Sequence, residues 1–431
     1  MNIYDQIKTM SDEMAGDLTA QRRDFHKYAE PGWFEMRTSS IIARKLTELG
    51  YEVLVGDQVC KKDSRMGVPS EEKLEEQYER AVAQGADPEF VKYTKGGMTG
   101  VIGILRCGEG PTVAMRFDID ALGVFEEHDP GHRPAKEGFN SVNEGFMHAC
   151  GHDGHATIGL GVAKVLMSIK DQLHGTVKLI FQPAEEAPGG ARKVMETGVL
   201  KDVQAIFGLH TSPLYDVGTL GIRSGAVTAS VDKFTVTFHG KGTHAAHPER
   251  GIDPIVMAAS FVTAAQSIVS RNIDPAYPGL VSITHIESGN TWNVIPESSW
   301  LEGTVRCLTA EDRKLIKKRI YELAEGQAAS FGGHAELTWY AGPPATDNTP
   351  DWTDCAIEVA KEAGLDVVPA PVNLAGEDFA YYQEEIPGVF VLVGTGKSPA
   401  NHNPKFHVDP AALGPAAIYM ARLAVEAFAR L

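Results

Sequence analysis

Residues 147–157 read Met-His-Ala-Cys-Gly-His-Asp-Gly-His-Ala-Thr, and this short stretch is unusually rich in side chains that bind metals. It contains one thiol, Cys150, and three imidazoles, those of His148, His152 and His155. A thiolate and neutral imidazoles are ligands of Zn²⁺ and of neighbouring first-row metals. The stretch also leads into an apolar segment, 155–169, with the pattern of a buried helix. It therefore predicts a metal site at the start of a helix.

Other polar side chains follow the ends of predicted strands. Open α/β sheets bind their ligands outside the carboxyl ends of the strands, so these groups are expected to meet in one crevice. Adjacent carboxylates in Phe181-Gln-Pro-Ala-Glu-Glu186 can supply one metal ligand and one general base. The groups are Asp118 and Asp120 after strand 112–117, Glu185 and Glu186 after strand 176–181, and His210 after strand 205–209.

Each of these residues also has an ordinary interpretation. A single histidine is more often a surface or core residue than a ligand, a single cysteine is more often inert, and an aspartate often caps a helix. Several such groups at successive strand ends make coincidence the weaker explanation. The other histidines lack this context, and we expect them to have no part in the site: His128, His132, His174, His239, His285, His334 and His402.

Composition limits the class of protein. The chain has 431 residues, which favours two domains, and 43% hydrophobic and 23% charged residues, which is typical of a globular protein. A net charge of −17 argues against binding of nucleic acids or anionic membranes, which requires a basic face. No run of eighteen apolar residues predicts a membrane helix, and the N-terminus lacks an apolar signal region. The five scattered cysteines favour a reducing cytoplasm over a disulfide framework.

The pattern of periodicity predicts an α/β fold interrupted by a smaller domain. Helices at 3–28, 39–49 and 155–169 alternate with the strands above, which predicts a mostly parallel sheet with helices on both faces. From residue 228 the order becomes β-α-β-β-α-β, the ferredoxin-like arrangement, and after Pro343-Pro344 the α/β pattern returns. We expect one domain over 1–226 and 343–431 and a second over 227–342. The charged stretch 56–96 has little apolar face and is expected to be a surface insertion.

Six motifs together resemble the dinuclear metallo-amidohydrolases, the family of aminoacylases, carboxypeptidase G and plant auxin-conjugate hydrolases. The resemblance covers essentially the whole chain and is to the branch in which a Cys-Gly-His motif replaces a bridging aspartate. It implies a catalytic domain with a lid or dimerisation domain inserted in it. The motifs are Arg22–His26, Asp118–Leu122, His148–His155, Gln182–Glu186, Gly240–Ala246 and Gly376–Phe379.

The resemblance implies two divalent metal ions, Mn²⁺ or Zn²⁺, and a role for each matching residue. Cys150 matches the bridging ligand, and the other implied ligands are His152, Glu186, His210 and His407, the last in Lys405-Phe-His-Val-Asp409. Glu185 matches the general base, and Asp120 an acid that orients a ligand imidazole. In the lid, His244 matches a histidine that reaches the active site of a dimer partner. Asn293 matches a residue near the substrate, and Arg306 or Arg223 is a candidate for binding a substrate carboxylate.

Within the family, residues 22–35, Asp63–Gly67 and His132–Pro134 are similar to the A-type subunits of the aminobenzoyl-glutamate hydrolases. This implies hydrolysis of the amide bond of an N-acyl amino acid, with p-aminobenzoyl-glutamate as the specific suggestion. Two alternatives stay open: a metal-dependent dipeptidase or aminopeptidase, and a non-catalytic metal-binding subunit of a heteromer. The family also implies a homodimer or a homologous heterodimer formed through the lid.

Overall fold

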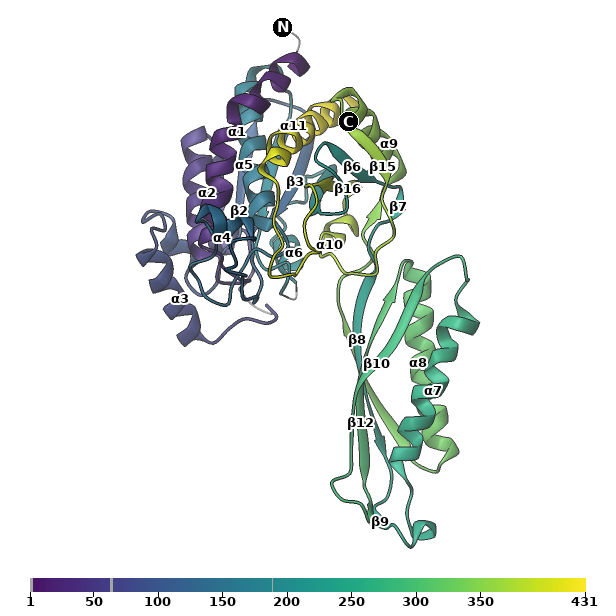
Figure 1. The fold of residues 1–431 in the computed structure, drawn as a ribbon. Coiled ribbons are helices and arrows are strands. Elements are labelled where there is room, and N and C mark those ends of the chain that lie inside the picture. Colours follow the sequence, from purple (N-terminus) through teal and green to yellow (C-terminus); the bar gives the residue numbers. More distant parts are fainter. Residues whose placement is uncertain (1–2, 63–64, 188) are drawn as a thin grey trace. The chain divides into compact units, whose positions relative to one another are not determined.

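The computed structural model describes residues 3–62, 65–187 and 189–431, so Asp63 and Ser64 of the matched segment lie outside the described residues. The chain divides into two compact units (Figure 1). Unit 1 consists of Met1–Gly225, Asp347–Pro371 and Tyr381–Leu431, and unit 2 of Ala226–Thr346 and Val372–Ala380. Segment 372–380 belongs to unit 2 because its backbone bonds to 227–229: Asn373 N donates to Val227 O (3.0 Å), and Ala229 N donates to Ala375 O (3.1 Å).

Unit 1 is built on an eight-stranded sheet in the order β1-β2-β4-β3-β5-β16-β6-β15. Its central strands β4, β3, β5 and β16 run parallel to one another and are almost entirely buried, which confirms the predicted mostly parallel sheet. The strands are β1 Glu52–Val55, β2 Val101–Arg106, β3 Thr112–Asp118, β4 Thr176–Gln182, β5 Ala205–Ser212, β6 Thr219–Ile222, β15 Asp366–Pro369 and β16 Gly388–Gly394. The short strands β7 Gly225–Ala226 and β14 Asp347–Asn348 lie outside this sheet.

Helix α5 (His152–Ser168) packs closely on the sheet and fixes where the Cys-Gly-His motif lies. Gly159 allows the close approach, since a Cβ there would lie 2.7 Å from ring atoms of both Phe117 and Phe181. The other helices of this part are α1 Ile3–Lys27, α2 Met36–Leu49, α3 Glu71–Ala83, α4 Arg133–Glu137, α6 Gly190–Met195, α9 Pro350–Glu362, α10 Ala380–Gln383 and α11 Leu413–Arg430.

One described segment, Pro410–Arg430, is long and apolar enough to cross a membrane by length and composition alone. In the structure 72% of its apolar window is buried, and α11 packs against α1 and α5. This is how the core helix of a globular unit behaves.

The stretch 56–96 carries more apolar packing than its composition suggested. Leu74 and Ala81 on α3, together with Ala86 and Val91, are buried against Met36 of α2. The expectation of a surface insertion with little to bury is therefore corrected, because the apolar partner is supplied by another part of the chain. The insertion and helix α2 share a small core.

Unit 2 has the predicted ferredoxin-like arrangement. Its four antiparallel strands lie in the order β10-β12-β8-β13, and Figure 1 shows α7 and α8 side by side on one face of the sheet. The elements are β8 Ser230–His239, β9 Thr243–His244, α7 Pro254–Asn272, β10 Gly279–Ser288, β11 Val294–Ile295, β12 Ser298–Cys307, α8 Ala310–Ser330 and β13 His334–Ala341. Its core is separate from that of unit 1.

Candidate metal centre

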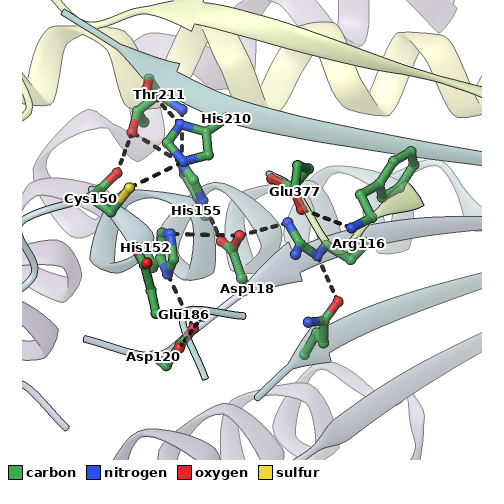
Figure 2. A network of polar contacts seen from close by, with 12 residues as sticks. Arg116, Asp118, Asp120, Cys150, His152, His155, Glu186, His210, Thr211 and Glu377 are labelled. Carbon is green, nitrogen blue, oxygen red and sulfur yellow. Dashed lines mark hydrogen bonds and ion pairs between the residues drawn. The ribbon is translucent and has the colours of Figure 1, made fainter. Parts of the chain in front are cut away.

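The predicted polar groups of unit 1 meet where the carboxyl ends of β3, β4 and β5 adjoin the start of α5 (Figure 2). Cys150, His152 and His210 form one group whose ligand atoms all lie within 4.8 Å of one another. Sγ of Cys150 is 3.3 Å from Nε2 of His210. Residues separated widely in the sequence therefore present a thiol and two imidazoles to one small volume.

Both imidazoles of this group are oriented through their Nδ1 atoms. Nδ1 of His152 lies 3.2 Å from Oδ1 of Asp120, and Nδ1 of His210 lies 2.7 Å from the carbonyl oxygen of Thr211. Such acceptors hold the proton on Nδ1 and leave the lone pair of Nε2 for a metal. Nε2 of His152 is buried and is directed at the Cys150 thiol and at Asp118, whose Oδ2 lies 3.7 Å away. A buried nitrogen whose neighbours are a thiol and a carboxylate fits a metal ligand.

A second group contains Cys150 again, with Glu186 and His402, and its ligand atoms also lie within 4.8 Å of one another. Nε2 of His402 is 3.2 Å from Oε1 of Glu186. The backbone of His402 has φ +68°, which is uncommon for a residue other than glycine, and its N–H donates to Ala149 O at 2.7 Å. A thiol that belongs to both groups is what a ligand bridging two metals requires.

The two glutamates lie at this same place. Glu185 and Glu186 form a third group with His152, and Oδ2 of Asp120 accepts a hydrogen bond from Glu186 N at 2.9 Å. Asp120 therefore contacts both a candidate ligand and the backbone of the turn that carries the two glutamates.

Electrostatics favour the deprotonated thiol. Burial opposes ionisation of Cys150, but the nearby charge of His210 and hydrogen bonds from His152 and His210 lower the pKa of the thiol to about 6. Hydrogen bonds to Cys150 and Glu186 raise the pKa of His402 to about 10. Burial lowers the pKa of His210, but the Cys150 thiolate outweighs it and raises that pKa to about 9. Without a metal, these shifts favour a thiolate beside imidazolium groups.

The glycine of the Cys-Gly-His motif is required by the fold. Gly151 has φ +89°, and a Cβ there would lie 2.3 Å from Oγ1 of Thr211. His155, in the first turn of α5, has both nitrogens engaged: Nδ1 with Asp118, and Nε2 with Thr211 N at 2.8 Å. Burial lowers the pKa of His155 to about 4, so it is held neutral as a structural partner of Asp118. His148 is buried near His26, with ring centroids 6.3 Å apart.

The expectation for His407 requires correction. Its ring lies 6.4 Å from that of His132, and its backbone N–H donates to Ser398 at 2.9 Å, whereas His402 is the histidine beside Cys150 and Glu186. Sequence reasoning set His402 aside because it does not follow a predicted strand directly. The available signal was its place in Asn401-His-Asn-Pro404, a turn-forming segment between β16 and α11.

A buried network behind the site was also missed. Asp153 accepts a hydrogen bond from Nε of Arg22 at 2.8 Å and lies 2.8 Å from Nδ1 of His26. Oε1 of Glu126 lies 2.8 Å from the other nitrogen of His26 and 2.9 Å from Nε2 of His132. Because Asp153 follows His152 directly, this network anchors the first turn of α5.

The remaining predicted residues lie in unit 2. His244 is exposed on β9, which pairs with β11, and Ala245 N donates to Asn293 O at 2.9 Å, so His244 and Asn293 are neighbours. Arg306 is half-buried on β12, and its guanidinium makes no hydrogen bond or ion pair with the residues that the structure describes. Burial lowers the pKa of Arg306.

Comparison with known proteins agrees with these features. The pattern of peptidase family M20/M25/M40 matches residues 114–426. The chain is 39% identical to N-acetylcysteine deacetylase of Bacillus subtilis, over 95% of this chain and 96% of that protein. It is 35% identical to the A-type subunit of p-aminobenzoyl-glutamate hydrolase from Escherichia coli, over 98% of each.

A crystal structure described as a dinuclear metal-binding peptidase of the M20 family, from Bacillus subtilis, has a TM-score of 0.79 and 36% identity, covering 97% of this chain and 100% of that one. The structure, the motifs and these relatives lead to one conclusion. The chain belongs to peptidase family M20/M25/M40 and is a metallo-amidohydrolase.

Proposed function

We propose that the chain hydrolyses the amide bond of N-acyl amino acids at a site that holds two divalent metal ions. The observation that carries the proposal is the thiol of Cys150, which belongs to two ligand groups at once. The names of the relatives, a deacetylase of N-acetylcysteine and a hydrolase of p-aminobenzoyl-glutamate, support this substrate class. The proposed ligands are Cys150, His152, Glu186, His210 and His402.

The residues of the site divide the chemistry. Metal ions bound here would polarise the substrate carbonyl and lower the pKa of a water molecule. Glu185 accepts the proton of the attacking water and delivers it to the departing nitrogen, a transfer typically worth roughly 10²–10⁴-fold in rate. Asp120 keeps the His152 imidazole in the tautomer that leaves Nε2 available. Adjacent glutamates thus take different roles.

Donor chemistry favours Mn²⁺ or Zn²⁺. A thiolate with imidazoles suits Zn²⁺, while the carboxylate of Glu186 is a harder donor that Mn²⁺ accepts. Metal analysis of the purified protein, followed by reconstitution of the chelated protein with each ion, tests the choice.

For the substrate we propose an N-acylated glutamate, with p-aminobenzoyl-glutamate as the specific candidate. Arg306 supports this choice, because a half-buried guanidinium is suited to a carboxylate. The relative that is 39% identical makes N-acetylcysteine the competing substrate. Assay of both compounds, together with other acetylated amino acids, decides between them.

We further propose a dimer, either of identical or of homologous protomers, in which His244 and Asn293 act on the substrate. The exposure of His244 and its pairing with the Asn293 segment support a role outside unit 2. His244 would donate a hydrogen bond to the oxyanion as the carbonyl is attacked, and loss of one such donor commonly costs about 10²–10³ in turnover. The free thiols of all five cysteines support a reducing cytoplasm as the location.

Two other functions are less well supported. A dipeptidase or aminopeptidase would need an acidic group to bind the free amine of its substrate, and the sequence motifs offer none. A non-catalytic subunit would have no reason to keep Glu185 beside an intact set of ligands. Release of the free amino acid from an N-acyl substrate, abolished by chelation and restored by metal, is the result that the proposal requires.

A further inference from the structure

The turn that carries Glu185 and Glu186 is held by carboxylates on both sides. Oε1 of Glu35 accepts a hydrogen bond from Ala184 N at 2.7 Å, and Oδ2 of Asp120 accepts one from Glu186 N at 2.9 Å. Glu185 lies between these two fixed amides. Two buried acidic side chains, those of Glu35 and Asp120, therefore fix the backbone on either side of the proposed base, Glu185.

Ala184 has a backbone conformation that needs such support. Its φ is +53°, a left-handed conformation that an alanine adopts only at a cost in free energy, and its side chain is fully buried. Nothing intrinsic to the Pro183-Ala184 sequence holds this geometry. The surrounding contacts must hold it.

The side chain of Glu35 does not cap the helix that it precedes. It occupies the N-cap position of α2, yet its carboxylate makes no cap hydrogen bond there. Instead Oε2 accepts a hydrogen bond from Oγ1 of Thr99 at 2.6 Å, while Oε1 reaches Ala184. Both Glu35 and Thr99 are fully buried. Burial, together with the charge of Asp120, raises the pKa of Glu35 well above its usual range.

Apolar packing also connects the turn with the α1–α2 loop and with residues before β2. Trp33, Cys60, Met98 and Ala184 form one buried cluster. Gly32 lies against the turn as well, because a Cβ there would be 2.9 Å from Cβ of Ala187. The α1–α2 loop therefore contacts the turn directly, and Cys60 and Met98 add apolar contacts to it.

We propose that Glu35 is a positioning residue that fixes the Pro183–Ala187 turn, so that Glu185 and Glu186 keep their separate places, with Thr99 holding Glu35 and Cys60 and Met98 packing on Ala184. This inference rests on the function proposed above for Glu185. Misplacing a reacting group by about 1 Å can cost roughly 10²-fold in rate. Glu35 touches neither substrate nor metal in this account.

Glu30 provides a matched control in the same loop. It is also a fully buried glutamate, but its oxygens accept hydrogen bonds from the backbone of Arg37 and Thr38 and from Arg80. Its bonds thus hold α2 and α3 instead of the turn. Glu30→Ala and Glu35→Ala remove the same side chain from the same degree of burial.

The test combines kinetics with hydrogen–deuterium exchange of the segment 181–192 in the full-length protein. We expect Glu35→Ala to lower kcat at least tenfold with KM within threefold, and to speed exchange of this segment at least tenfold. Glu35→Gln is expected to restore both, since its amide oxygen can accept from Ala184 N and its amide nitrogen can donate to Thr99. Glu30→Ala is expected to lower thermal stability while leaving kcat within twofold and exchange of 181–192 unchanged.

Two outcomes overturn the inference: exchange of 181–192 that is unchanged in Glu35→Ala, or a loss of kcat that Glu30→Ala reproduces in full. Failure of the proposed function has a different signature, since the unaltered protein would then show no metal-dependent amide hydrolysis. Hydrogen–deuterium exchange of the chelated protein can be measured without turnover. It therefore tests whether Glu35 fixes the turn independently of whether the proposed function is right.

Discussion

Nε2 of His402 lies 3.2 Å from Oε1 of Glu186, which brings a loop between β16 and α11 to the turn after β4. The same imidazole hydrogen-bonds to Cys150, and Asn401 lies beside it with its Nδ2 atom 3.5 Å from Sγ of Cys150. The loop therefore adds His402 to the ligand group of Cys150 and Glu186. Two histidines of this loop, His402 and His407, can be compared directly.

His402→Ala should remove one ligand from the site, whereas His407→Ala should not. We expect His402→Ala to retain at most one metal ion per chain and to lose at least a hundredfold in kcat/KM. His407→Ala should keep the metal content of the unaltered protein and most of its activity. Metal analysis after dialysis checks both variants. The opposite pattern, with metal lost only from His407→Ala, would restore the assignment made from the sequence.

Removal of metal should expose a reactive thiolate at one position. The pKa of about 6 for Cys150 contrasts with Cys60 and Cys355, where burial raises the pKa to about 12 and about 11. At pH 7 the chelated protein should therefore react with iodoacetamide at Cys150 and remain unmodified at Cys60 and Cys355. Bound metal should protect Cys150. Mass spectrometry of the labelled peptides reads out all three positions, and labelling of Cys150 only above pH 8 would contradict the assignment.

Glu185→Gln should separate proton transfer from metal binding. The substitution keeps the size of the side chain but removes its ability to accept a proton, so we expect kcat to fall roughly 10²–10⁴-fold. Metal content should be unchanged, because Glu186 and the other ligands are intact. Steady-state kinetics and metal analysis on the same preparation check this. An active Glu185→Gln protein would remove Glu185 from the mechanism.

The buried network around Glu126 predicts a pH-dependent stability. Burial raises the pKa of Glu126, but hydrogen bonds from His132 and His26 outweigh it and bring the pKa down to about 2. The unfolded chain, with a pKa near 4.3, binds more protons between these values, so Glu126 stabilises the fold above pH ~4.3 and this contribution is lost as pH falls toward 2. At 1.36 kcal/mol per pKa unit its size is about 3 kcal/mol.

Urea unfolding of Glu126→Gln at several pH values checks this. The loss of stability relative to the unaltered protein should be largest at pH 6 and should shrink steadily at pH 4 and pH 3. Glu144→Gln, a nearby exposed glutamate, serves as the control and should show no such trend. If the loss of stability in Glu126→Gln did not depend on pH, the hydrogen bonds of Glu126, and not its charge, would be what stabilises the fold.

Much of the architecture is readable from the sequence because it depends on local patterns. The buried strands β3, β4 and β5 show as apolar runs, and the β-α-β-β-α-β order of unit 2 is visible in its periodicity. Most of the groups at the candidate site follow from the position of polar residues at strand ends. Asp120, Cys150, His152, Glu186 and His210 all lie together in the structure.

The features that sequence reasoning missed depend on contacts between distant segments. His402 lies in an irregular loop, and its side chain reaches the site through contacts with Cys150 and Glu186, which are far away in the sequence. The stretch 56–96 shows little apolar face in the sequence, and the sequence does not show that Met36 packs on Leu74 and Ala81. Segment 372–380 joins unit 2 through backbone bonds that leave no pattern in the sequence.

The central claim, two metal ions joined by one cysteine, is tested most directly by anomalous diffraction from crystals of the protein loaded with Mn²⁺ or Zn²⁺. We predict two anomalous peaks about 3.5–4 Å apart, both within bonding distance of Sγ of Cys150, with His402 bound to one of them. A single peak, or peaks away from Cys150, would contradict the account.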